Sequence, residues 1–261
     1  MDHEPKRRPA LRQQARVAQV VIDREQLRQA LFVQGAKQTG VFGAEGDCER
    51  PDSLLGHLAP FLRSVSFWFV CLLSFGLTLI RETFNLWTPT YLVEAAGLSN
   101  SRAAEASALF PFFGGLSVIA AGYLSDTVAK GRRAGVICLF LIPGAIVMTL
   151  LGTVAQDSST AVKLVLVSAA GFLIIGPYSF LAGSISLDIG SKRGVATSAG
   201  IVDAVGYLAG ILSGRYVGTL AQDHGWTHAF GFLAIVALLS AVAAAAYWVI
   251  QERSKRRAEP Q

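Results

Sequence analysis

One arginine within a long apolar run is the residue of this sequence best suited to bind an anion. Arg81 lies near the middle of residues 64–93, and this run is longer than the roughly 20 residues that a helix needs to cross a bilayer. An arginine at the centre of such a helix costs about 3 kcal/mol on insertion scales, so it is expected only beside a partner or a water-filled cavity. A guanidinium keeps its charge when desolvated and donates paired, charge-assisted hydrogen bonds to anionic oxygens. Arg81 is therefore a candidate for anion binding.

Further polar residues follow the same side of this predicted helix. They recur at the spacing that places residues on one helix face. Two interpretations are open: the stripe lines a substrate path, or it forms an interhelical hydrogen-bond seam in which Arg81 pairs with an acid such as Glu82 or Asp203. The stripe comprises Ser74, Thr78, Arg81, Asn85 and Thr88.

Composition places the chain among membrane proteins with several spans. Of its 261 residues, 52% are hydrophobic and 16% are charged, and the mean hydropathy is +0.46. This is too apolar for an ordinary soluble domain. The net charge of +5 does not indicate nucleic-acid binding, because the lysines and arginines lie beside and between apolar runs rather than on one soluble face. We predict an all-α membrane protein whose partner is the lipid bilayer.

Six apolar runs predict a six-helix transmembrane bundle within residues 61–251. Lysine and arginine accumulate in cytoplasmic loops. The segment before the first run, the loops after the second and fourth runs, and the C-terminal tail are basic, whereas the other three loops carry only Arg102 and Lys163. We therefore predict a multi-pass protein of the cell membrane with both termini cytoplasmic. The runs are residues 64–93, 103–125, 134–155, 161–187, 194–220 and 227–250.

Two polar segments flank the predicted bundle. Residues 1–60 carry nine basic and eight acidic residues and lack an apolar core behind a basic start, so we predict a cytoplasmic extension rather than a secretory signal. A short membrane-surface helix within this extension is an alternative. Residues 252–261 form a basic cytoplasmic tail. The three cysteines show neither metal-ligand nor CxxC spacing, and we predict no metal site and no cofactor.

The fourth and fifth runs carry features that concern helix packing and charge. Pro177, after Gly176, falls close to the midpoint of the fourth run, where it would bend the helix. Such interruptions border the binding sites of some transporters, but membrane helices also tolerate them elsewhere. Asp203 in the fifth run is predicted to be a proton or ion-pair site, or a structural pair. It shares its face with a small-xxx-small ladder that allows close helix approach, formed by Gly206, Gly210, Gly214 and Gly218.

The segment GYLSDTVAKGRR at 122–133 follows the second run. Gly122 permits close packing, Asp126 can cap a nearby helix, and Arg132 and Arg133 hold the loop at the cytoplasmic surface. With Gly131 these residues form a candidate gating loop. The ordinary alternative is a basic inside loop.

This loop resembles the signature of the major facilitator superfamily. RETFNLWTPTYL at 81–92, GFLIIGP at 171–177, and GYLAG followed by HGW at 224–226 resemble its organophosphate:phosphate antiporter branch, which includes glycerol-3-phosphate, hexose-phosphate and glucose-6-phosphate transporters. The matches cover about residues 64–250 and correspond to helices seven to twelve. The resemblance implies half of a twelve-helix fold, with residues 1–60 resembling the loop between the halves.

The resemblance also implies exchange of an organic phosphate ester for inorganic phosphate. In this branch an arginine on the seventh helix, followed by W-[ST]-PTYL, contacts substrate phosphate, and Arg81 stands at that position. Asn85, Trp87, Tyr91 and Tyr178 are expected as its neighbours in the cavity. The branch has a second phosphate-binding arginine on its first helix, which lies outside the half that this chain matches.

Three functional classes follow from these observations. The first is a carrier that works with a second six-helix half or with another copy of itself. The second is a membrane sensor or interaction subunit that binds a phosphate ester without moving it. A truncated inactive carrier is a further alternative to transport. A membrane enzyme is disfavoured, because no Ser/His/Asp, zinc-ligand or paired-carboxylate set converges.

Overall fold

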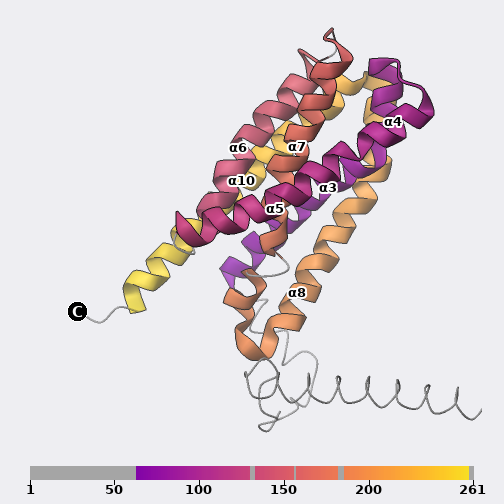
Figure 1. Cartoon of the computed structure of the whole chain (residues 1–261). Coiled ribbons are helices and arrows are strands. Elements are labelled where there is room, and N and C mark those ends of the chain that lie inside the picture. The colour runs from indigo at the N-terminus through magenta and orange to yellow at the C-terminus, as the bar shows by residue number, and fades with distance from the viewer. Residues whose placement is uncertain (1–62, 130–132, 156, 182–184, 259–261) are drawn as a thin grey trace, which may run out of the picture. The chain divides into compact units, whose positions relative to one another are not determined.

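A computed structural model describes residues 63–129, 133–155, 157–181 and 185–258 (Figure 1). The predicted cytoplasmic extension at 1–60 lies outside these residues. Every described element is a helix, which confirms the all-α prediction. The elements are α3 (Val65–Ala96), α4 (Asn100–Ser107), α5 (Leu109–Thr127), α6 (Arg133–Gly152), α7 (Thr160–Phe180), α8 (Ser186–Leu212), the π-helix η2 (Ser213–Val217), α9 (Gly218–His224) and α10 (Trp226–Ala258).

Six helical segments in the described part of the chain are long and apolar enough to cross a membrane, as predicted. The second combines α4 and α5, and the fifth runs from Ala196 through η2 to His224. The first span ends where Gly97 adopts a left-handed conformation with φ 65° and caps α3 by donating to the Leu92 and Val93 carbonyls, the usual role of glycine after a helix.

The fourth span differs from its prediction. The apolar run was expected to continue to Leu187, whereas α7 ends at Phe180. Pro177 therefore lies in the last turn of α7, and the predicted mid-span position of this proline is wrong. A proline in the last turn removes one backbone hydrogen bond near the end of the helix rather than at its centre.

Helix α3 packs against most of the other elements and organises the bundle. It contacts α8, α10 and α7, while α5 pairs with α7 and α6 pairs with α10 (Figure 1). The first half of α3 contributes strongly to the apolar core, since Phe67, Leu73, Leu77 and Ile80 are fully buried. Arg81 follows Ile80 directly and is only partly buried, so the fully buried stretch ends at the middle of the helix.

The glycine ladder of α8, η2 and α9 faces α3. A Cβ atom added at Gly206 would collide with the hydroxyls of Ser74 and Thr78, and one added at Gly218 would collide with the indole of Trp87. Gly210 and Gly214 approach α3 less closely. The predicted close approach of a second helix is therefore confirmed, and its partner is the helix that carries Arg81.

Candidate functional site

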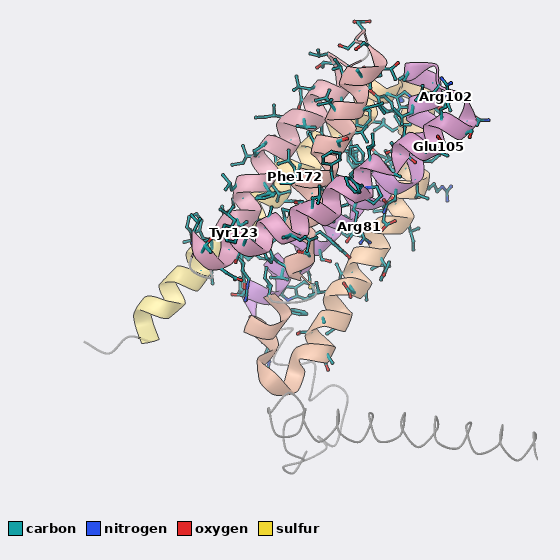
Figure 2. The ribbon with its side chains drawn as sticks, viewed as in Figure 1. Arg81, Arg102, Glu105, Tyr123 and Phe172 are labelled. Carbon is teal, nitrogen blue, oxygen red and sulfur yellow. The ribbon has the colours of Figure 1, made fainter. Side chains whose placement is uncertain are left out.

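Arg81 is the centre of the candidate site and makes two contacts of different kinds. Its Nη2 atom lies 2.5 Å from Oε1 of Glu82, and the two side chains are 21% and 25% exposed. Its guanidinium carbon lies 4.1 Å from the centroid of the Tyr178 ring, within the range of a cation–π contact. Figure 2 shows Arg81 in the middle part of the bundle, well away from Arg102 and Glu105 near α4.

Tyr178 reaches Arg81 because α7 packs beside α3. Arg81 of α3 and Asp203 of α8 both lie within electrostatic range of the Tyr178 hydroxyl. Charged residues of α3 and α8 thus lie near Tyr178, whose ring packs against the Arg81 guanidinium. One donor there is unpaired, because Arg81 Nε is buried and has no hydrogen-bond partner among the described residues.

The polar stripe of α3 divides into a buried part and an accessible part. Ser74 donates a hydrogen bond of 2.8 Å to the Val202 carbonyl on α8, so this position is a seam between helices. The Thr78 hydroxyl is buried against Gly206 of α8, and Asn85 is exposed. Of the two acids considered as partners of Arg81, Glu82 makes the ion pair.

Trp87 is fixed against the η2 segment. Its Nε1 atom donates a hydrogen bond of 3.1 Å to the Ser213 carbonyl, and its ring lies against Gly218. Sequence reasoning did not foresee η2, although π-helical turns are frequent at functional sites. The local sequence signal is a pair of glycines, Gly214 within η2 and Gly218 directly after it.

Tyr91 belongs to an aromatic cluster rather than to the surroundings of Arg81. Its ring packs edge-on against Trp226 and Phe230, with centroids 5.3 and 5.0 Å away. The side chain is 1% exposed, and its hydroxyl has no partner among the described residues. Beside it lies a cavity of about 10 Å³, close to the minimum for one water molecule. The cavity is lined by Thr83, Phe84, Trp87, Thr88, Tyr91, Trp226 and Phe230.

The remaining predicted site residues lie on α8 and near the ends of α5 and α6, and two of them lie outside the described residues. Asp203 is half-buried on α8, within electrostatic range of the Tyr178 hydroxyl. Gly122 and Asp126 lie near the end of α5, where Asp126 is exposed, and Arg133 begins α6. Gly131 and Arg132 lie outside the described residues, so the gating role of this loop stays a prediction. Within the described residues, no group of three or more His, Cys, Asp and Glu side chains is placed to hold a metal ion.

The six apolar spans, the partly exposed arginine within them and the glycine seam describe a multi-pass helical membrane protein, and this class agrees with the sequence comparison. The model of the Major Facilitator Superfamily matches residues 4–214. The chain therefore belongs to the Major Facilitator Superfamily, and it is a multi-pass membrane protein.

Several similar proteins are named as transporters or exchangers. The chain is 27% identical over 192 residues to the probable hexose phosphate transport protein of Chlamydia trachomatis, an alignment that covers 73% of this chain and 41% of the relative. It is 27% identical over 189 residues to the glycerol-3-phosphate transporter of Bacillus subtilis, covering 72% and 42%. It is 30% identical over 162 residues to the glucose-6-phosphate exchanger SLC37A2 of Mus musculus, covering 59% and 32%. The chain thus spans less than half the length of each of these relatives.

Proposed function

We propose that this chain is the C-terminal half of a carrier that exchanges organic phosphate esters for inorganic phosphate, with Arg81 as the principal anion contact. The observation that carries this proposal is the position of Arg81. Its guanidinium lies at the middle of the bundle, stacked on Tyr178 and still partly exposed. Relatives named as phosphate-ester transporters support the same ligand class.

The chemistry around Arg81 suits a phosphate group. A guanidinium presents a planar fork that matches phosphate oxygens at two points, and the buried Nε atom has no partner among the described residues. Stacking on Tyr178 fixes the plane of this fork. Asn85, exposed on the next turn of α3, can hydrogen-bond a sugar or glycerol hydroxyl.

Transport by this route requires a second bundle. In alternating access one bundle rocks against another around a site near the bilayer midplane, and one bundle supplies only one wall of that site. The spans of α5 and of α8 with α9 are only 22% and 28% buried within this chain, compared with 56% for α3. Their apolar faces, which carry Ile119 and Ile211 at 72% and 71% exposure, suit a second half or another copy of this chain as well as lipid.

The test is exchange in reconstituted vesicles. The purified 261-residue chain is reconstituted alone and together with a six-helix N-terminal half, and the exchange of labelled inorganic phosphate for glucose 6-phosphate is measured. We expect exchange only when both halves are present. Robust exchange by the demonstrably monomeric chain would refute the half-carrier proposal, and phosphate binding without exchange in either preparation would favour the sensor.

The proposed orientation places both termini in the cytoplasm, in the cell membrane, on the basis of loop charge. Single reporter cysteines test it in intact cells. A cysteine at Ser158, which follows α6, should react with an impermeant reagent added outside. A cysteine at Ser191 should be protected, and the reverse pattern would invert the topology.

A further inference from the structure

We propose that Glu82 is a specificity-determining residue that competes with the phosphate ligand for the guanidinium of Arg81. This inference rests on the proposed function and deepens it, because it states which anion holds the arginine when no ligand is bound. Glu82 follows Arg81 in sequence, and its carboxylate makes the ion pair at 2.5 Å.

Glu82 contacts the guanidinium nitrogen that a phosphate group would also need, Nη2 of Arg81. A guanidinium offers two edges for two-point binding, one formed by Nε and Nη2 and the other by Nη1 and Nη2. Glu82 Oε1 lies at Nη2, which is common to both edges. A phosphate group that binds either edge must therefore displace the carboxylate or accept it as a negatively charged neighbour.

The surroundings of Glu82 permit such a displacement. Its side chain is 25% exposed, so it can leave Arg81 for water without being buried unpaired. On the side of α8, Gly210 approaches Glu82, since a Cβ atom added there would lie 3.6 Å from Glu82 Cγ. The ring of Tyr178 on α7 packs against the guanidinium, so Arg81 stays in place when Glu82 moves.

The pair also sets the charge of the site. Arg81 and Glu82 together carry no net charge, and the other charged group described near Tyr178 is Asp203 on α8. Because Glu82 is the residue next to Arg81 in the chain, its charge still repels a bound anion after displacement. The repulsion is greater for a doubly charged phosphate ester than for a singly charged sulfate ester. Glu82 therefore lowers the affinity of the site for phosphate. It also reduces the preference of the site for a doubly charged phosphate ester over a singly charged sulfate ester.

The test uses Glu82→Gln, which keeps the shape of the side chain and removes its charge. Arg81 in the purified full chain is modified with phenylglyoxal, and the modification is quantified by mass spectrometry at increasing concentrations of inorganic phosphate, glucose 6-phosphate or a sugar sulfate. Partly exposed charge pairs contribute about 1 kcal/mol, so we expect about fivefold lower protecting concentrations of the phosphates in E82Q. The change for the sulfate ester should be smaller. Glu105→Gln, an exposed glutamate on α4, is the matched control and should behave as wild type.

Each outcome decides between the two claims. Protection of wild-type Arg81 by phosphate, with equal or weaker protection in E82Q, would overturn the role of Glu82 and leave the phosphate site intact. An equal gain for the phosphate and sulfate esters would also overturn it, because a purely structural effect does not depend on ligand charge. Absence of protection by any anion in any variant would overturn the phosphate site and the role of Glu82 with it. Glu82→Asp, which keeps the charge, should remain close to wild type.

Discussion

Helix α3 is built differently on the two sides of Arg81. Before Arg81 it faces α8 through the small hydroxyls of Ser74 and Thr78, which lie against Gly206, with one directional bond from Ser74 to the Val202 carbonyl. After Arg81 it contributes Phe84 and Tyr91 to an aromatic cluster with Phe110, Trp226 and Phe230. The first region brings two backbones together, whereas the second fills space with large rings.

This difference indicates which part of the helix is sensitive to small changes in volume. Close backbone approach in membranes depends on small residues, and one added methyl group separates the helices. Aromatic rings pack in several offset or edge-on arrangements and tolerate the loss of a polar atom. Arg81 lies at the boundary between the two regions. We therefore expect changes in the seam with α8 to alter ligand binding at Arg81 more than changes in the aromatic cluster do.

The largest effect is expected at the boundary itself. Arg81→Lys keeps the charge but loses the planar fork and the stacking on Tyr178. We expect binding of labelled phosphate or glucose 6-phosphate to weaken about a hundredfold, since hydrogen bonds between charged groups contribute about 1.5–3 kcal/mol. Arg215→Lys, an exposed arginine in η2, is the control and should bind normally. Binding by R81K at the wild-type level would refute the assignment of Arg81.

The second prediction concerns the seam. Gly206→Ala places a Cβ atom against the Ser74 and Thr78 hydroxyls, and overpacking of this kind costs about 1–3 kcal/mol. We expect a lower free energy of unfolding in detergent, measured by denaturant titration. Gly200→Ala on the same helix is the matched control, because nothing lies within 4 Å of the added atom and alanine favours a helix. If the two variants are equally stable, the seam is less tightly packed than its geometry indicates.

A smaller effect is expected where α3 meets the start of α10. Trp226 Nε1 donates a hydrogen bond of 2.8 Å to Glu94 Oε2, while its ring packs on Tyr91 and Phe230. Trp226→Phe removes the hydrogen bond and keeps a ring, so we expect a loss of about 1 kcal/mol or less in the free energy of unfolding. Trp226→Ala removes the ring as well and should cost clearly more. Equal losses in the two variants would show that the hydrogen bond, rather than ring packing, stabilises this end.

The sequence predicted the spans, the buried arginine and the glycine face, because hydropathy and helical period are local properties. It did not predict the aromatic cluster, since Phe110, Trp226 and Phe230 lie far from Tyr91 in sequence and only the packing of α5 and α10 on α3 brings them together. It also misplaced Pro177, because apolar residues continue beyond the end of α7 and hydropathy alone does not mark where a helix stops. Tyr178 was expected near Arg81, and its position over the guanidinium depends on how α7 packs on α3.

The smallest effect is expected at the Tyr91 hydroxyl, and it is the most informative about the aromatic region. This hydroxyl is buried and has no partner among the described residues, and a buried polar group in that state costs about 1–3 kcal/mol. If the adjacent cavity of about 10 Å³ is dry, Tyr91→Phe should leave the free energy of unfolding unchanged or raise it, with phosphate binding unaffected. If one water molecule bridges the hydroxyl to Thr88, the same change should destabilise the bundle by about 1 kcal/mol, and Thr88→Val should have a similar effect that is not additive with it. A strong loss of phosphate binding in Y91F with normal stability would instead place Tyr91 at the ligand, and the division of α3 into a sensitive seam and a tolerant aromatic region would fail.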